Sequence, residues 1–222
     1  MRFAALETSS DWCSVALWLD GEIVSVERRA PNRHSELVLP MLHQLLKERC
    51  LKMENIEAIA FGAGPGAFTG LRIACGIGQG LALARGLPVA GVSSFDAMAE
   101  ECGAARVVAC IDARMHEVYY AALEREGAGW REAVPGRCVA PDAAEPPPGE
   151  GWVGCGSGFA AFPAFLQNKI AGMNPAIHPT AHAVAKLAAP QLLAGKGVDA
   201  SQALPTYFRD KVAFTKAELA AR

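Results

Sequence analysis

Two segments far apart in the chain follow the same pattern, and this repetition constrains the fold more than any other feature. Residues 6–19 (LETSSDWCSVALWL) and 111–124 (IDARMHEVYYAALE) each run from an apolar strand through an acidic residue and a short polar loop into a second apolar strand. Self-similarity within a chain indicates a repeated structural unit. The sequence therefore predicts an α/β protein with two lobes built on related plans.

Turn and cap residues place the other elements. Asp20-Gly21, between two apolar runs, has the composition of a hairpin turn. Ser35 is expected to cap a helix over 35–49, with Pro40 near its first turn, and Thr180 to cap a helix over 180–193. The proline-rich residues 141–151 are expected to form a surface loop. The expected strands cover 3–7, 13–19, 22–27, 56–61, 88–92, 107–112, 117–123 and 152–156, and further helices cover 71–84, a stretch from about 94, and 159–167.

Chain length agrees with this division. The 222 residues correspond to one large domain or two small lobes when about 150 residues are allowed per domain. We expect an N-terminal lobe over residues 1–102 and a C-terminal lobe over residues 103–222, whose tail helix can pack back on the first lobe.

Charge and hydropathy exclude several classes of protein. The chain has 21 Lys and Arg against 23 Asp and Glu, so it lacks the basic surface of a protein that binds nucleic acid tightly by itself. It shows neither a bilayer-spanning segment nor the central region of a secretory signal. Its seven cysteines form no C-x-x-C pair and indicate reduced, mostly buried thiols. These features predict a cytoplasmic protein that does not contact a membrane.

The segment Gly64-Pro65-Gly66-Ala67-Phe68-Thr69-Gly70-Leu71-Arg72 is expected between a strand and a helix. Glycines let a backbone approach a phosphate, and a helix N-terminus favours an anion. The spacing matches neither G-x-G-x-x-G nor a P-loop. A tight turn that supports packing is the alternative interpretation. The candidate anion contacts in this segment are Gly64, Gly66, Thr69 and Arg72.

The acidic turns of the repeated pattern are a second candidate. Glu7, Thr8 and Ser9 follow the first strand, and Asp112 ends the first strand of the second half. In a two-lobed nucleotide enzyme, such turns face each other across a cleft and contact phosphate and metal. Arg114 stands where a glycine-rich phosphate hairpin is expected, and it opposes a bound cation. A solvated turn with a local salt bridge is the alternative.

The histidines do not complete a catalytic or metal site. His178 and His182 have helical spacing, but Pro179 and the cap Thr180 leave His178 outside the helix. His34 and His43 lie nine residues apart, which is not a ligand spacing. No G-x-S-x-G motif or activated cysteine is present.

The helix over 35–49 is unusually apolar. Seven apolar residues in ten positions are too many for one buried stripe, so some are expected to face outward and to be covered by another subunit. The alternative is a helix sandwiched within its own domain. The seven residues are Leu37, Val38, Leu39, Met41, Leu42, Leu45 and Leu46.

Taken together, the motifs resemble the TsaB family, bacterial partner proteins in the biosynthesis of threonylcarbamoyladenosine on transfer RNA, once grouped with glycoprotease-like proteins. The resemblance covers nearly the whole chain and is weakest over 124–150. It rests on ALETSSDWCSVALWLDGEIV, HSELVLPMLHQLL, FGAGPGAFTGLRIACGIGQGLALARGLPVAGVSSFDAMA, IDARMHEVYYA, VGCGSG and PTYFRDKVAFTK.

The resemblance implies the two-lobed fold of actin, sugar kinases and heat-shock ATPases, with a mixed sheet flanked by helices in each lobe. It also implies a non-catalytic scaffold or activator of the paralogue TsaD, which transfers the threonylcarbamoyl group to the adenosine beside the anticodon. TsaD carries a metal-binding H-x-x-x-H, and this chain has no such pair before residue 116. No metal or cofactor is expected for this chain, although ATP or ADP can bind at the level of the complex.

The resemblance further implies pairing with TsaD through the helices at about 35–49 and 70–85, homodimers through the same face, a TsaE-type ATPase in the assembly, and indirect contact with tRNA. The expected partner-binding residues are Leu37, Val38, Met41, Leu42, Leu45, Ile73 and Ile77. Glu7 departs from the aspartate that relatives have in this turn, which weakens a nucleotide contact there.

Two enzyme alternatives remain open at this stage. One is an ATP-dependent phosphotransferase with Glu7, Thr8, Gly66, Thr69 and Asp112 across the cleft. The other is a metallopeptidase, as the older family grouping suggests. In addition, Arg209, Lys211 and Lys216 in the tail are either RNA-phosphate contacts or charges of a solvated helix end.

Overall fold

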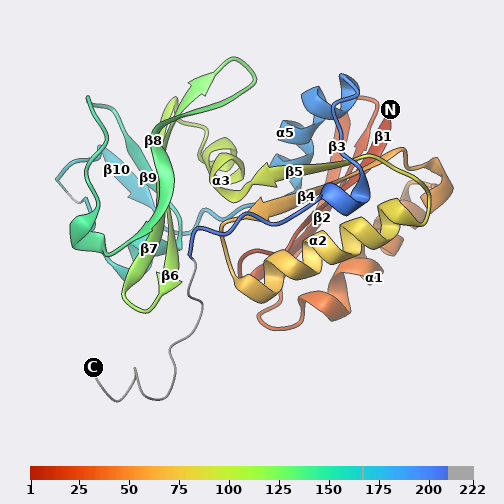
Figure 1. Ribbon diagram of the computed structural model, residues 1–222, viewed down its shortest axis with the longest axis horizontal. Helices are drawn as coiled ribbons and strands as arrows, with labels where there is room; N and C mark the ends of the chain where they lie inside the picture. Colours follow the sequence, from red (N-terminus) through yellow and green to blue (C-terminus); the bar gives the residue numbers. More distant parts are fainter. Residues whose placement is uncertain (167, 210–222) are drawn as a thin grey trace.

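The computed structural model describes residues 1–166 and 168–209. They form two lobes side by side, each built on a five-stranded mixed sheet (Figure 1).

The first lobe contains the sheet with the order β3-β2-β1-β4-β5. Strands β1 to β3 form an antiparallel meander, and β4 and β5 continue the sheet in parallel with β1. Asp20 and Gly21 connect β2 to β3 with positive φ angles of 54° and 110°, as the hairpin prediction requires. The strands are β1 (Arg2–Glu7), β2 (Trp12–Leu19), β3 (Glu22–Arg29), β4 (Ala58–Gly64) and β5 (Val89–Ser93).

The second sheet repeats this plan strand for strand. Its order is β10-β9-β6-β7-β8, with β6 to β8 antiparallel and β9 and β10 parallel to β6. The prediction of two lobes on related plans is therefore confirmed. The strands are β6 (Arg106–Arg114), β7 (Glu117–Glu126), β8 (Gly129–Val139), β9 (Val153–Cys155) and β10 (Gly172–Asn174).

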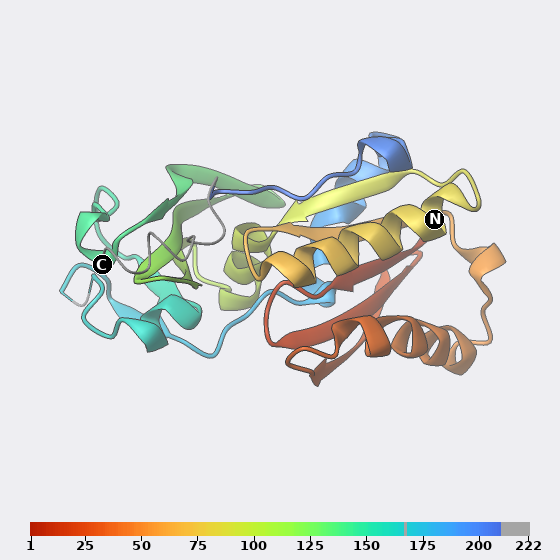
Figure 2. The same cartoon turned by 60° about the horizontal axis from the view of Figure 1, so that its bottom comes forward.

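Helices cover both faces of the first sheet. Helices α1 (His34–Glu48) and α2 (Phe68–Leu83) lie on one face and α5 (Ala181–Leu193) on the other (Figures 1 and 2). Side chains along β1 therefore alternate between the two faces of the sheet: Leu6 packs toward α1 and α2, and Phe3 packs toward α5. All of β1 except Arg2 is buried as a result.

The second sheet has a thinner cover. Helix α3 (Ser94–Cys102) packs on one face through Phe95 and Met98, and α4 (Ser157–Ala161) packs on the other through Phe159. The short 3-10 turns are η1 (Met53–Asn55), η2 (Pro141–Ala143) and η3 (Ala200–Gln202). The expected fold class, two α/β lobes with mixed sheets flanked by helices, is confirmed.

The chain crosses between the lobes more than once. After β10 it returns to the first lobe to form α5, and Val198 bridges to Val89 on β5. Residues 203–209 then run back toward the second lobe, as the dark blue segment of Figure 1 shows. We call residues 203–209 the strap.

Several sequence expectations are corrected. Strands β8 and β10 were not expected. Helix α1 begins at His34, with Arg33 rather than Ser35 at the N-cap, and Pro40 lies inside the helix. Helix α4 ends at Ala161 instead of reaching residue 167, since Pro163 disfavours helical geometry in the residue before it. The prediction for Thr180 is confirmed, because its hydroxyl accepts a hydrogen bond from the Ala183 amide at 3.1 Å.

Among the described residues, no helix is long and apolar enough to cross a membrane.

Candidate functional site

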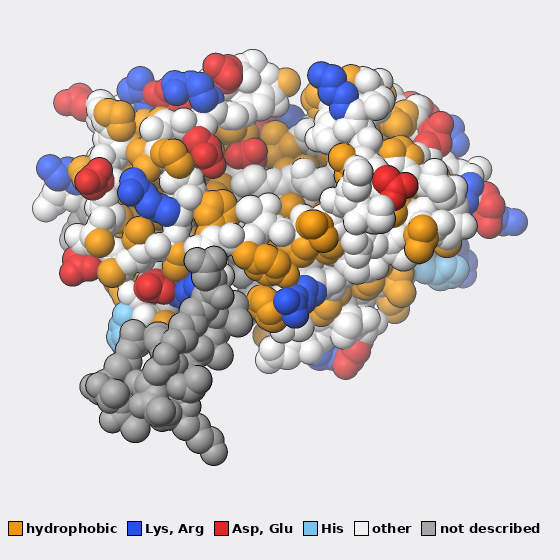
Figure 3. Space-filling model, viewed as in Figure 1, with side chains coloured by type: hydrophobic (Ala, Val, Ile, Leu, Met, Phe, Trp, Pro, Cys, Tyr) orange, Lys and Arg blue, Asp and Glu red, His pale blue; other side chains and the backbone are white. Residues whose placement is uncertain are grey.

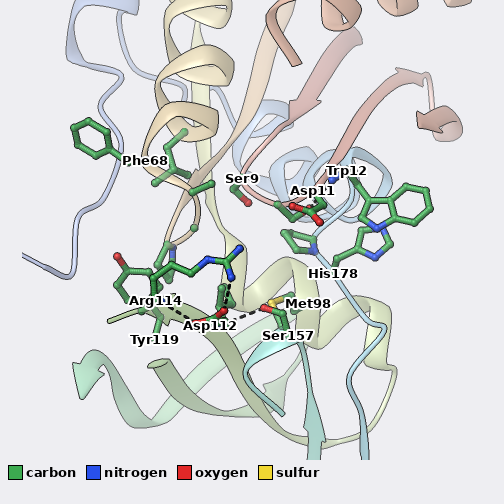
Figure 4. A pocket seen from close by; sticks show the side chains of 18 of the residues that line it. Ser9, Asp11, Trp12, Phe68, Met98, Asp112, Arg114, Tyr119, Ser157 and His178 are labelled. Atoms are coloured by element: carbon green, nitrogen blue, oxygen red, sulfur yellow. Dashed lines mark hydrogen bonds and ion pairs between the residues drawn. The ribbon is translucent and has the colours of Figure 1, made fainter. Parts of the chain in front are cut away.

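A cavity of about 730 Å³ lies between the two lobes. The two turns of the repeated pattern meet here, as Ser9 lines it from the first lobe and Asp112 from the second (Figure 4). The cavity is also lined by the crossing segment 175–179 and by the strap residues Thr206, Tyr207, Phe208 and Arg209.

Glu7 does not line this cavity. Its side chain is completely buried, and its Oε1 accepts a hydrogen bond from the Ser9 amide at 2.5 Å. Its Oε2 has no hydrogen-bond partner. Burial raises the pKa of Glu7 to about 7, although the hydrogen bonds from Ser9 oppose the shift. Glu7 is thus a sealed carboxyl group rather than a ligand presented to the cleft.

The glycine-rich loop packs directly on the turn that follows β1. The Ala67 amide donates to the Ser9 carbonyl at 2.7 Å, and Thr8 Oγ1 donates to the Gly70 carbonyl at 2.7 Å. A Cβ atom on Gly66 would lie 2.5 Å from the Ser9 carbonyl oxygen, and one on Gly70 would lie 1.9 Å from the Thr8 carbonyl oxygen. The chain's own backbone therefore fills the space in which a phosphate would meet these glycines.

Two other residues of the loop segment contact the strap. The Arg72 guanidinium lies 3.7 Å from the centre of the Phe68 ring, and Arg72 Nε donates to the Tyr207 hydroxyl at 3.1 Å. Gly64 has a φ of 112°, and a Cβ atom there would lie 2.8 Å from the Thr206 carbonyl oxygen. Gly64, Thr69 and Arg72 are not among the cavity-lining residues.

In the second lobe, Arg114 neutralises Asp112. Arg114 donates to the Asp112 carboxylate from its amide at 2.8 Å and from its guanidinium at 2.9 Å, and Ser157 Oγ accepts from the Asp112 amide at 3.1 Å (Figure 4). Arg114, Met115 and His116 all have φ near 60°, a conformation that is unfavourable for residues other than glycine. The local salt bridge of the alternative interpretation is present.

Arg209 of the strap fixes this second turn, and the sequence did not single out that role. Its guanidinium donates to the Ala113 carbonyl at 2.9 Å and pairs with Glu117. The side chain is 12% exposed and lies over the Tyr119 ring. Lys211 and Lys216, considered with Arg209 as RNA contacts, lie outside the described residues.

An aromatic contact in the wall of the cavity was not predicted from the sequence. The rings of Trp12 and His178 stack with centroids 4.8 Å apart and an interplanar angle of 5° (Figure 4). His178 Nε2 lies 3.3 Å from Glu27 Oε2. This stack joins the crossing segment to β2 and β3, so His178 acts as a structural contact between chain segments.

The cations that line the cavity are all paired. Arg29 approaches Asp11 at 3.5 Å, Arg114 pairs with Asp112, and Arg209 pairs with Glu117. Within residues 1–166 and 168–209, no group of three or more His, Cys, Asp or Glu side chains is arranged to hold a metal. Among the described residues, the cavity thus offers an anion no unpaired lining cation.

The first-lobe helices require a correction. Val38, Met41, Leu42 and Leu45 are at most 5% exposed and belong to the chain's own core, so the expectation that they face a partner is wrong. Leu37 is half-buried against that core. Leu39, which the partner-binding set did not include, is 45% exposed.

Helix α2 presents an open face. Ile73 and Ile77 are half-buried, and no atom lies within 4 Å of a Cβ atom placed on Gly76 or Gly80. At the first turn of α2, the exposed rings of Phe68 and Tyr207 lie with their centroids 5.7 Å apart. Figure 3 shows hydrophobic side chains gathered near the junction of the lobes.

The chain is similar to proteins of one known family. The model of the family described as "TsaD: tRNA N6-adenosine threonylcarbamoyltransferase" matches residues 26–219. The tRNA threonylcarbamoyladenosine biosynthesis protein TsaB of Escherichia coli is 38% identical, with 97% of this chain and 98% of that protein covered. The protein of the same name from Haemophilus influenzae is 35% identical, with 97% of each chain covered.

Two solved structures from Pseudomonas aeruginosa have the same fold. One, described as an uncharacterized protein with similarity to peptidase YEAZ, superposes with a TM-score of 0.86 at 36% identity and covers 94% of this chain and 99% of that one. The other, YeaZ, has a TM-score of 0.85 at 37% identity and covers 93% and 99% of the two chains.

Proposed function

The chain belongs to the TsaB family of tRNA threonylcarbamoyladenosine biosynthesis proteins, and we propose that it is a non-catalytic activator of a TsaD-type transferase. It binds that paralogue through the exposed faces of α1 and α2. Binding stabilises the active arrangement of the transferase, which is a population shift driven by contacts that the active state alone makes.

The observation that carries this proposal is the open face of α2. Gly76 and Gly80 lie one helical turn apart, both are exposed, and a Cβ atom placed on either would meet no neighbouring atom within 4 Å. Small residues at such spacing let a helix of another chain approach the backbone closely. On the neighbouring helix α1, Leu39, Pro40 and His43 are exposed and can line the same contact.

The cavity supports an activator better than an ATP-dependent phosphotransferase. Glu7 is sealed in the core, the glycine loop is filled by the Thr8-Ser9 backbone, and Arg114 neutralises Asp112. A metal-bound nucleotide needs carboxylate oxygens and backbone amides that it can reach, and Glu7 is buried away from the cavity while Asp112 is paired with Arg114. The metallopeptidase alternative has no supporting donor set in the described residues.

The proposal extends to the assembly. The face of α1 and α2 also mediates homodimers when the chain is alone. A TsaE-type ATPase joins the complex, where ATP or ADP binds at the level of the assembly. Contact with tRNA is indirect, because the chain's charges are balanced at 21 basic and 23 acidic residues.

The testing experiment measures threonylcarbamoyl transfer to tRNA by the TsaD-type paralogue and the pathway ATPase, with and without this chain, alongside the chain alone. Transfer is expected only in the full mixture. Transfer that is equally fast without the chain would overturn the proposal.

A pair of variants locates the docking face. Gly76→Arg is expected to abolish activation and to lower affinity for the paralogue at least tenfold, while the melting temperature stays equal or rises because arginine favours a helix more than glycine does. Leu193→Arg adds the same charge at an exposed position of α5, 58% exposed on the opposite side of the sheet, and is expected to behave as wild type. Equal activity of both variants would place the contact elsewhere.

A further inference from the structure

Two cysteines meet where the second sheet packs on α3. Cys102 lies in the last turn of α3, and Cys155 is the final residue of β9. The Cys155 thiol donates to the Met98 carbonyl at 3.8 Å. Met98 is one helical turn before Cys102, so both lie on the same face of the helix.

A second contact fixes the approach of the two elements. A Cβ atom on Gly156, the residue after Cys155, would lie 2.2 Å from Met98 Cε. Cys155 shares a buried cluster with Phe95 and Ala99, and Cys102 packs against that cluster. The end of β9 is thus held tightly against α3, with Cys102 and Cys155 packed at the same buried cluster.

The two thiols differ in accessibility and in acidity. Cys102 is partly exposed, whereas Cys155 is fully buried. The neighbouring Cys155 thiol lowers the pKa of Cys102 to about 6. Cys102 in turn, together with burial, raises the pKa of Cys155. Cys102 is therefore the thiolate that solvent reaches, and Cys155 is a protonated thiol behind it.

We infer that Cys102 and Cys155 form a reversible disulfide by exchange with a small-molecule disulfide such as oxidised glutathione. The Cys102 thiolate attacks one glutathione sulfur, and the other glutathione leaves as a thiolate that takes a proton from water. Cys155 then loses its proton, attacks the Cys102 sulfur of the mixed disulfide and releases the second glutathione. Two protein thiols are oxidised and one glutathione disulfide is reduced to two thiols.

The disulfide would link α3 to a segment in the wall of the cavity. Met98 lines the cavity, and so does Ser157, two residues beyond Cys155, whose hydroxyl accepts from the Asp112 amide. A disulfide between residues 102 and 155 closes a long loop, and such links stabilise the folded state mainly by restricting the unfolded chain. Oxidation should therefore raise the melting temperature and hold the wall of the cavity in place.

The test uses the full-length chain incubated with mixtures of reduced and oxidised glutathione, followed by alkylation and peptide mass spectrometry. The expected result is a Cys102–Cys155 linked peptide, the loss of two free thiols and a higher melting temperature that reductant reverses. Cys50 is exposed and remote in sequence, so Cys50→Ser is the matched control and should still form the link.

Single variants separate the two steps. Cys155→Ser should stop at glutathione attached to Cys102, and Cys155→Ala serves if the serine variant is poorly folded. Cys102→Ser should form no internal link. The inference is wrong if Cys50 takes up glutathione while Cys102 and Cys155 remain free, or if Cys155→Ser fails to trap glutathione on Cys102.

Discussion

The carboxylate of Glu7 occupies the space that a side chain at position 62 would need. A Cβ atom on Gly62 would lie 1.7 Å from Glu7 Oε2. Gly62 lies on β4, which pairs with β1 in parallel, so the missing side chain on one strand makes room for the acid on its neighbour. The carboxylate is thereby held away from the cavity, which Ser9 and Ser10 line from the turn that follows β1.

Gly62→Ala should destabilise the protein, because the added methyl group clashes with the buried carboxylate. Overpacking of a core costs about 1–3 kcal/mol. Combining Gly62→Ala with Glu7→Ala should recover part of this loss. Urea unfolding of the single and double variants measures the coupling. Gly76→Ala, which meets no atom within 4 Å, is the control and should stabilise the helix by about 0.5–1 kcal/mol.

Glu7 should make the protein less stable as pH rises. Its pKa in the folded state, about 7, exceeds the ordinary value of 4.5. The stability that this group contributes is therefore fully present below about pH 4.5 and is lost as pH rises through about 7, by about 3 kcal/mol in total. Relative to wild type, Glu7→Gln should gain stability between pH 5 and pH 8.

Urea unfolding at these two pH values checks the effect of Glu7. Glu36→Gln, on the exposed side of α1, is the matched control, and its free energy of unfolding should change with pH as that of wild type does. Identical pH dependence of wild type and Glu7→Gln would contradict the assignment.

Leu42→Glu is expected to unfold the protein, and not merely to weaken binding to a partner. Leu42 is 2% exposed in the core beneath α1, and an unpaired charge buried there costs several kcal/mol. Leu39→Glu, at a 45% exposed position, should change stability by less than about 0.5 kcal/mol and weaken binding to the paralogue. Thermal melting and a binding titration on both variants distinguish these effects. Normal folding of Leu42→Glu would refute the burial of this face.

Arg209→Ala should loosen the turn between β6 and β7. The substitution removes the hydrogen bond to the Ala113 carbonyl and the ion pair with Glu117, a loss of about 1–3 kcal/mol for a partly buried charged group. Hydrogen exchange in residues 113–117 should accelerate. Arg49→Ala removes an exposed pair with Glu22 and should cost at most about 1 kcal/mol. Unchanged exchange at the turn would show that the strap does not hold it.

Much of the fold could be predicted because most of its strands and helices have a regular apolar periodicity in the sequence. The meander at the start of the first sheet and the pair β6 and β7 all follow from such patterns. Strand β8 was not predicted because charged residues, Pro135 and Gly136 interrupt the apolar–polar alternation of its sequence, GWREAVPGRCV. Strand β10 was not predicted because its three residues are exposed at the sheet edge and so carry no apolar pattern.

The candidate site was harder to predict, because spacing along the chain does not say which way a side chain points. The turn after β1 and the glycine loop are close in space, as their motifs suggested, yet Thr8 and Ser9 contact the loop directly instead of sharing a ligand with it. In α1, the count of apolar residues was correct, but the sheet buries most of them. The strap carries no periodicity, so only the folded chain reveals that Arg209 reaches the second lobe.

The two sheets have one topology but unequal connections. In the first lobe, α1 joins β3 to β4 and α2 joins β4 to β5; in the described part of the second lobe, the matching connections carry only η2 and the five-residue α4. The duplicated plan therefore bears a paired-helix surface on one half alone. If two copies bind each other through this surface, no second such surface is left free, so the assembly closes at a pair and does not elongate into a filament.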